Sequence, residues 1–446
     1  MSAEAVSRAV QRVEARRRDL GMAVRAAADA LTAGEGTEMI HQAALQQFLW
    51  WHLPRRYPED EWDALADATA ELLNELDMAR LAKIARSGET AVVLDAWAEG
   101  PEIGAAMFRD VHRGSGVEPP DTPLLAWGSY MGIDEARAIE AVERALGDAI
   151  ATEQLVPGAS RWRGKAAAIT EEILSRPLDL PPGQTLAGLV TTERIATWIG
   201  AAHHPLHQEW RSSVANRLLN RVEPPADPSS AVGPMQWLLG LASDGGAELT
   251  QSHYLARATV VAAVERFGWW DWPKPPRSES DVHQLLTVRG AATRLRLVRR
   301  RGRRLLLTTL GKGLLQDPRR LWEVVSAETE DGEDFTRMVT ELVGLRLLRG
   351  RVEQRQLVTD INTILVAQGW ATSSGPLTRD HVSSAIWRAL RWWRIFASLD
   401  EVQSTWEPST ARELTPHTLA LTPDGEQMVL AFLRSRAAGP RTRRPG

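Results

Sequence analysis

Apolar residues recur every three or four positions through the first 175 residues of the chain. Val6, Val10 and Val13 keep this spacing near the N-terminus, and the stretch from Ala136 to Leu146 keeps it further on. Such spacing gathers the apolar side chains on one face of an α-helix. Clusters of glycine and proline interrupt the pattern and separate one helix from the next. We therefore predict an all-helical domain over residues 1–175.

Two segments rich in proline follow this predicted domain. Residues 177–183 read Pro-Leu-Asp-Leu-Pro-Pro-Gly, and residues 223–228 read Glu-Pro-Pro-Ala-Asp-Pro. Both compositions suit linkers, because proline and glycine disfavour the interior of a helix. The residues from 184 to 245 are expected to form a short helical connecting unit.

The second half of the chain contains an internal duplication. One apolar helical stretch ends at Gly268-Trp269 and another ends at Gly369-Trp370. A Leu-Thr-x-x-Gly motif follows each of them, at Leu307–Gly311 and at Leu421–Gly425, with the second spacing 13 residues longer. An apolar helix follows each motif, and the motif's threonine is placed to cap it.

The duplication sets the expected domains of this half. We predict one unit over residues 246–322, then a connecting helix and a second unit over residues 323–436. The last residues, 437–446, are basic and rich in glycine and proline, and we expect a disordered tail there.

Local signals predict the elements inside the first copy. Ser278 and Asp281 have the spacing of a capping box that opens one helix. Thr287 is the expected cap of the next helix, which runs to about Leu295. Thr308 then caps the helix that follows the hairpin.

The second copy carries similar signals. Thr378 is the expected cap of a helix that runs through His381 to Leu390, and residues 392–397 are expected to begin a hairpin. Thr422 caps the final helix.

Charge is unevenly distributed along the chain, although 53 basic and 57 acidic residues give a formal net charge of only −4. Residues 1–120 contain 13 basic and 20 acidic residues. Residues 286–320 contain 11 basic residues and a single acidic one, Asp317. An acidic domain beside a basic segment is typical of proteins that bind a polyanion.

The basic segment has the pattern of a hairpin. Residues 297–300 and 303–307 read as two short strands, with Arg301-Gly302 as the tight turn in which glycine supplies a positive φ. A helix followed by such a hairpin can dock on nucleic-acid phosphates, whereas the alternative is a set of arginines on ordinary solvated surface. The candidate nucleic-acid-binding residues are Arg289, Arg294, Arg296, Arg299, Arg300, Arg301, Arg303 and Arg304.

The order of helix, basic hairpin and Leu-Thr-x-x-Gly-x-x-Leu-Leu resembles the winged-helix superfamily, particularly bacterial regulators of the MarR-like and PadR-like types. The resemblance covers residues 248–320 and, more weakly, residues 351–436. It implies a third helix that carries Arg289, Arg294 and Arg296, and a wing that carries the remaining arginines. Together with the apolar spacing of the first 175 residues, the resemblance gives the expected fold class: mainly α, with a helical N-terminal domain followed by two winged-helix-like α+β units that have short β-hairpins.

Two features depart from this resemblance. The insert at residues 273–276, Pro-Lys-Pro-Pro, lengthens the connection between the first two helices of the first copy. Two copies in one chain also differ from a simple dimeric regulator, in which two subunits read a palindromic operator. The resemblance therefore does not imply palindromic binding.

Tryptophan is unusually abundant, with 18 residues against 6 Phe and 3 Tyr. Pairs occur at Trp50-Trp51 and Trp392-Trp393, and three tryptophans lie between Trp269 and Trp272. Most lie in apolar helical patterns, so we expect them mainly to fill cores. The alternative is that some stack on bases or on a planar ligand.

No motif for catalysis, metal or cofactor binding is complete. The chain has no cysteine, and the proline in His203-His204-Pro205-Leu206-His207 interrupts the helical face that would aim two imidazoles at one ion. Gly311-Lys312-Gly313 lacks the other residues of a phosphate-binding loop. We expect a non-enzymatic protein with no metal or cofactor.

No apolar run is long enough for a membrane helix, and we expect a cytoplasmic protein without a membrane partner.

Two functional hypotheses remain. In the first, the protein is a regulatory DNA-binding protein that holds duplex DNA through the first copy, while the N-terminal domain binds a protein partner or self-associates. In the second, both copies form an interaction scaffold with tryptophan-rich surfaces. The second copy is not expected to be the main DNA contact, because its hairpin region is acidic where the first copy has arginine. Its acidic residues are Asp400, Glu401, Glu407 and Glu413.

Overall fold

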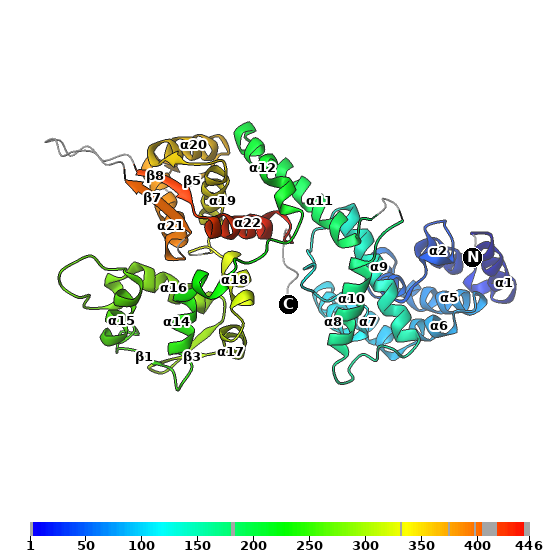
Figure 1. Ribbon diagram of the computed structural model, residues 1–446. Coiled ribbons are helices and arrows are strands. Elements are labelled where there is room, and N and C mark those ends of the chain that lie inside the picture. Colours follow the sequence, from blue (N-terminus) through cyan, green and yellow to red (C-terminus); the bar gives the residue numbers. More distant parts are fainter. Residues whose placement is uncertain are drawn as a thin grey trace. The chain divides into compact units, whose positions relative to one another are not determined.

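The computed structural model describes residues 3–179, 183–330, 332–372, 375–396, 398–403 and 417–440. The chain is mainly helical, with small antiparallel sheets of two or three strands in its C-terminal half, as the sequence predicted (Figure 1). It divides into two compact units. The first unit comprises Met1–Glu193 with Pro440–Gly446, and the second unit comprises Arg194–Gly439.

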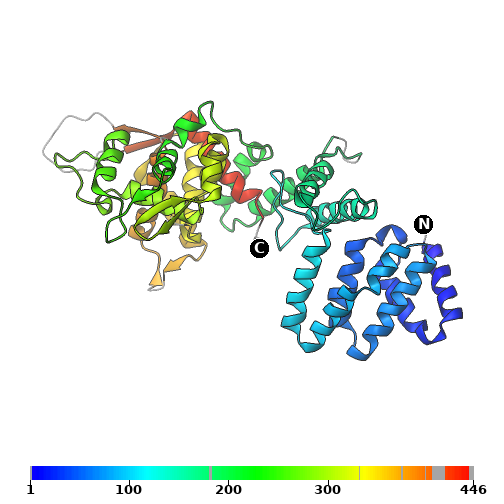
Figure 2. The same ribbon diagram turned by 90° about the horizontal axis from the view of Figure 1, so that it is seen from below.

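The first unit is built from helices, which Figure 2 shows in the blue and cyan part of the chain. Its α-helices are α1 (Ala3–Arg16), α2 (Gly21–Thr32), α3 (Gln42–Gln47), α4 (Leu53–Arg56), α5 (Trp62–Glu75), α6 (Ala79–Ala85), α7 (Gly88–Glu99), α8 (Pro101–Ser115), α9 (Ile133–Ala151), α10 (Trp162–Ser175) and the start of α11 (Leu186–Gly200). Shorter turns of helix are η1 (Arg18–Leu20), η2 (Thr37–Met39), the π-helical η3 (Phe48–His52) and η4 (Glu59–Glu61).

The apolar spacing of the sequence becomes the core of this unit. Val6, Val13 and Val24 are buried in a cluster that runs from α1 to α7. A second cluster joins α9, α10 and the first half of α11, where Leu146, Leu174 and Val190 are fully buried. The predicted helical character of this region is therefore confirmed.

The boundary between the units lies at Glu193/Arg194, inside α11, and not in the proline-rich segment at residues 177–183. The ends of that segment are held together, since Pro177 and Thr185 form a β-bridge and the amide of Leu178 donates to Gln184 O at 2.7 Å. The chain thus enters α11 through a closed loop, and α11 begins as part of the first unit's core.

The second unit contains the remaining elements. Its helices are α12 (Pro205–Leu218), α13 (Pro228–Ala231), α14 (Gly233–Leu241), α15 (Arg257–Phe267), η5 (Glu279–Asp281), α16 (His283–Arg294), α17 (Thr309–Leu315), α18 (Pro318–Ser326), α19 (Asp334–Leu348), α20 (Gln354–Ala367), α21 (Arg379–Ile395) and α22 (Pro423–Ala437). Its strands are β1 (Ala247–Glu248), β2 (Val298–Arg301), β3 (Arg304–Leu307), β4 (Val352–Glu353), β5 (Ala371–Thr372), β6 (Gly375–Pro376), β7 (Leu399–Gln403) and β8 (His417–Leu421).

The second unit repeats one topology twice. The first copy runs from β1 to α17 and the second from β4 to α22, each as strand, helix, helix, hairpin, helix. Each copy has an antiparallel three-stranded sheet in which the first strand pairs with the last one, in the orders β1-β3-β2 and β4-β8-β7. Figure 1 shows the two sheets on opposite sides of this unit, with α16 and α21 between them.

The Leu-Thr-x-x-Gly motif has the same structural role in both copies. The hydroxyl of Thr308 accepts from the Gly311 amide at 3.0 Å, and that of Thr422 accepts from the Gly425 amide at 2.9 Å, so both predicted caps are confirmed. A Cβ on Gly311 would lie 2.1 Å from the carbonyl oxygen of Leu297. The glycine of the motif therefore lets the start of α17 pack directly against Leu297, the residue that precedes the hairpin.

Gly425 meets the equivalent constraint in the second copy. A Cβ there would lie 2.0 Å from the carbonyl oxygen of Ser398, which precedes β7 as Leu297 precedes β2. Such a distance is far below van der Waals contact, so only glycine lets the two backbones approach.

One cluster of buried residues runs from Ile195 to Ala438 and includes both copies. The connecting unit from residue 195 to 245 and the units 246–322 and 323–436 therefore share a core instead of having one each. The C-terminal helix extends to Ala437, and Ala437 and Ala438 are buried, so the residues expected to begin a disordered tail are packed. Residues 441–446 of that expected tail lie outside the described residues.

The first copy shows where the local predictions held and where they failed. The capping box of Ser278 and Asp281 is confirmed. Thr287 is not a cap, because α16 already begins at His283 and the Thr287 hydroxyl, inside the helix, donates to Glu330 at 3.3 Å.

In the second copy the cap at Thr378 is confirmed, but α21 continues to Ile395. The prediction that a hairpin begins at residues 392–397 is therefore wrong for 392–395. Trp392 and Trp393 are each 1% exposed, and burial of these rings keeps the segment helical. Ala397 lies outside the described residues.

Candidate nucleic-acid interface

The end of α16 and the β2–β3 hairpin present the candidate arginines. Leu285, Val288 and Ala292 hold the inner face of α16 in the core. The helix ends at Arg294, and Arg296 has a φ of 55°, in the left-handed region. This turn places Arg296 beyond the helix, on the connection to β2, and not on the helix as the resemblance implied.

The strand register sorts the hairpin arginines by face. Arg299 pairs with Leu306, and Arg301 pairs with Arg304. Directly paired residues of an antiparallel ladder point to the same side, and alternate residues share that side. Arg299, Arg301 and Arg304 therefore lie on one face of the hairpin, and all three are exposed.

The opposite face of the hairpin is apolar except at its end. Val298, Leu305 and Leu307 are buried there, and Arg300, opposite Leu305, remains exposed. The turn is Gly302-Arg303, one residue later than predicted, with Gly302 at a φ of 59°. Glycine at the first position of a two-residue turn suits that conformation.

Arg289 belongs to the interior support of the site. Its Nε lies 2.6 Å from Glu279 Oε1, and Glu279 is fully buried. The other oxygen of Glu279 accepts from the Leu255 amide at 2.7 Å. Arg289 therefore neutralises a buried carboxylate, which makes it a positioning residue for α16.

Three further arginines donate to backbone carbonyl oxygens. Arg294 donates to Thr329 O at 2.6 Å, Arg303 to Leu249 O at 3.2 Å, and Arg304 to Gly245 O at 2.6 Å. These bonds fix the side chains without cancelling their charge, because a carbonyl group carries no net charge.

The guanidinium groups of the remaining four arginines make no hydrogen bond or ion pair within the described part of the chain: Arg296, Arg299, Arg300 and Arg301. All four are exposed. One exposed carboxylate, Glu248 on β1, pairs in register with Arg304 and shares its face. The hairpin thus carries an excess of positive charge with a single acidic residue at its edge strand.

The second hairpin has a different character. Asp400 is exposed on β7, and Glu401 lies next to it on the same strand. Glu407 and Glu413 lie outside the described residues. Where the structure describes it, the second hairpin places acidic residues in the strand that corresponds to the arginine-rich β2.

The histidine motif is divided between two structural roles. Nδ1 of His204 accepts from the Leu206 amide at 3.2 Å and caps α12. His207 is fully buried, and its Nε2 lies 3.0 Å from Glu341 Oε1. No group of three potential metal-ligating side chains occurs among the residues that the structure describes.

Glu341 on α19 is the centre of a buried ionic cluster. Besides the bond to His207, it accepts from Arg211 Nε at 2.8 Å and from Arg436 Nε at 3.2 Å. Burial alone would raise the pKa of Glu341, but the hydrogen bond from His207 and the charges of the two arginines lower it to about 2. Burial lowers the pKa of His207, and the neighbouring Arg211 charge adds to that effect, although the bond to Glu341 opposes it. The cluster joins α12, α19 and α22.

Sequence reasoning missed this cluster and the partners of Arg289 and Arg294. Glu341 lies 134 positions from His207 and 130 from Arg211. The sequence did contain one signal for the cluster. Glu341 lies in the mostly apolar stretch Met338–Leu348, and an ionised group that is buried there requires a partner of opposite charge.

Comparison with protein families gives a match for part of the second unit. Residues 229–320 are similar to the Y4jL N-terminal domain family. This segment contains the whole first copy and the arginine hairpin. No curated protein matches the chain, and no solved structure does. Among the described residues, none of the helices combines the length and the hydropathy that a membrane span requires.

Proposed function

We propose that the protein binds duplex DNA through the β2–β3 hairpin and the end of α16, as a regulatory protein of the winged-helix type. The observation that carries the proposal is the set of four exposed guanidinium groups without an internal partner, at Arg296 and Arg299–Arg301. Three arginines on one hairpin face could each approach a phosphate of the same backbone. Phosphate contacts of this kind position a protein on the duplex.

The arginines have different roles in this proposal. Arg299, Arg301 and Arg304 bind phosphates, and Arg296, Arg300 and Arg303 add positive potential around them. We assign the contact with base edges to Arg294, which is exposed at the end of α16. Arg289 holds the helix through Glu279 and makes no contact with DNA.

The second copy contributes to folding in this proposal. Its shared core with the first copy supports the hairpin, and its acidic β7 does not face phosphate. Since the copies share that core, an isolated fragment would expose apolar surface, and the binding experiment requires the full chain.

A direct test is fluorescence anisotropy of a labelled random-sequence duplex titrated with the full-length protein at several salt concentrations. Binding that weakens steadily with added salt is the expected result, because bound arginines release counterions from the DNA. Absence of binding at low salt would favour the alternative, a scaffold that contacts other proteins.

A further inference from the structure

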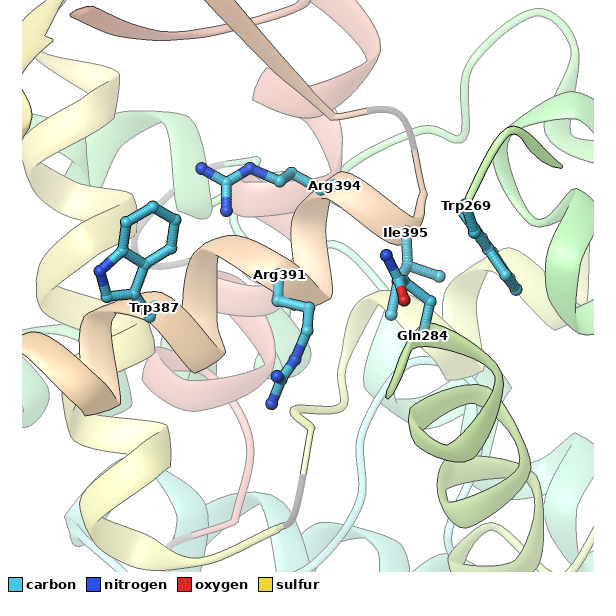
Figure 3. A pocket seen from close by; sticks show the side chains of 6 residues that line it. All are labelled: Trp269, Gln284, Trp387, Arg391, Arg394 and Ile395. Carbon is cyan, nitrogen blue, oxygen red and sulfur yellow. The ribbon is translucent and has the colours of Figure 1, made fainter. Parts of the chain in front are cut away.

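A groove lies between the two copies of the second unit. Two adjoining cavities of about 380 and 660 Å³ form it, and both are lined by Trp269, Arg394 and Ile395. Figure 3 shows the smaller cavity, with Trp269 and Trp387 at its two ends and Arg391 from α21 between them. We call these two cavities the interdomain groove.

Aromatic side chains form much of the groove. Trp387 is 44% exposed, whereas the neighbouring Trp392 and Trp393 on the same helix are buried. Phe267 stacks on Trp269 with ring centroids 4.7 Å apart, and Trp237 meets Phe267 edge-on at 5.8 Å. An exposed ring at one end and an aromatic stack at the other provide flat apolar surfaces for a planar molecule.

Three arginines line the same groove, and none of its described lining residues is Asp or Glu. The Arg394 guanidinium lies 4.9 Å from the Trp387 ring centroid, and that of Arg266 lies 5.7 Å from the Phe267 ring centroid. Arg391 pairs with Glu330, which is not among the lining residues. The groove therefore joins aromatic surfaces to positive charge.

We propose that the interdomain groove binds a free nucleotide. A base would stack on the exposed indole of Trp387, and the phosphates would lie against Arg391 and Arg394. Guanidinium groups bind phosphate oxygens through paired hydrogen bonds, which makes arginine well suited to this ligand. Ser229 and Gln236 line the larger cavity and offer polar groups to a sugar.

The size and charge of the groove favour a nucleotide over a simple aromatic acid. A single carboxylate can be neutralised by one arginine, whereas Arg266 and Arg394 line this groove beside Arg391, whose charge is shared with Glu330. Cavities of several hundred Å³ hold ligands of the size of a nucleotide. The inference does not depend on the arginine hairpin, since no hairpin residue lines the groove.

The test is isothermal titration of the full-length protein with ATP, adenosine and tripolyphosphate. ATP is expected to bind more tightly than either of the other two, because only ATP has both the base and the phosphates. Trp387→Leu and Arg394→Gln are each expected to weaken ATP binding by roughly tenfold, the effect of losing one base stack or one charged contact.

Matched controls come from another Trp–Arg pair. The Arg163 guanidinium lies 5.4 Å from the Trp162 ring centroid on α10 of the first unit, and neither residue lines the groove. Trp162→Leu and Arg163→Gln should leave ATP affinity unchanged. Circular dichroism checks that every variant is folded.

Several outcomes would overturn the proposal. They are a wild type that binds no ATP, equal binding of ATP and tripolyphosphate, and unchanged ATP affinity in both groove variants. Binding of a single-stranded oligonucleotide without binding of ATP would also overturn it, since the site would then recognise a strand.

Discussion

Replacing Glu341 with glutamine tests the buried ionic cluster. Glu341 is 0% exposed and Arg211 is 3% exposed, so both charges are removed from water. Glutamine keeps the size of the side chain but removes the negative charge, which leaves Arg211 buried without a compensating carboxylate. Breaking a buried pair by removing one partner costs about 3–5 kcal/mol.

The assay is urea denaturation followed by circular dichroism, with tryptophan fluorescence as a second probe. With an m-value of about 3 kcal/mol/M, the expected destabilisation moves the midpoint of the second unit's transition by roughly 1–2 M. Glu323→Gln is the matched control, because Glu323 pairs with Arg221 at the surface. Such pairs contribute about 0–1 kcal/mol. Equal midpoint shifts for Glu341→Gln and Glu323→Gln would refute the reasoning.

The second unit should lose stability as pH falls below about 6.5 towards 2, because the folded-state pKa values of His207 and Glu341 are both lowered and the unfolded chain therefore takes up protons first. Melting temperatures at pH 7, 5 and 3 measure this loss, and a melting temperature that does not change with pH would contradict it. Gly311→Ala should destabilise the second unit by about 1–3 kcal/mol, because the added Cβ would clash with the backbone of Leu297. Gly313→Ala on the same helix is the control, because open space surrounds its Cβ and no such loss is expected. Equal denaturation midpoints for the two variants would exclude the clash. Arg294→Gln should change the preference among DNA sequences more than the salt dependence, as competition between labelled duplexes would show.

Local features were the most predictable from the sequence. The caps at Ser278, Thr308, Thr378 and Thr422 were confirmed, because each depends on a hydrogen bond to a residue two or three positions away. The duplication was also visible, since both copies need the same glycine for the same close backbone approach. Such constraints leave a pattern over a few residues.

Non-local contacts were harder to predict. Apolar spacing identified the buried face of each helix but not its partner, so two copies with one core appeared as separate units. The bond from Arg294 to Thr329 depends on how the chain returns to α16, and the pairing of Arg289 with Glu279 depends on how η5 packs against α16. An arginine with an internal partner and one without look alike in sequence.

The salt dependence of DNA binding by a hairpin variant is the most direct measurement of the proposed function. Arg299→Gln, Arg300→Gln and Arg301→Gln together remove three charges that have no partner in the described structure. Arg299 and Arg301 are the proposed phosphate contacts among the three, so the slope of log affinity against log salt should flatten by about 1.8, at about 0.9 for each contact. The loss should be similar for every DNA sequence.

The matched control removes the same charge elsewhere in the second unit. Arg217, Arg221 and Arg319 pair at the surface with Glu426, Glu323 and Glu223, and their replacement by glutamine should leave the slope unchanged. Flattening confined to the hairpin variant is the predicted result. An unchanged slope in the hairpin variant, or equal flattening in both variants, would contradict a phosphate-binding hairpin.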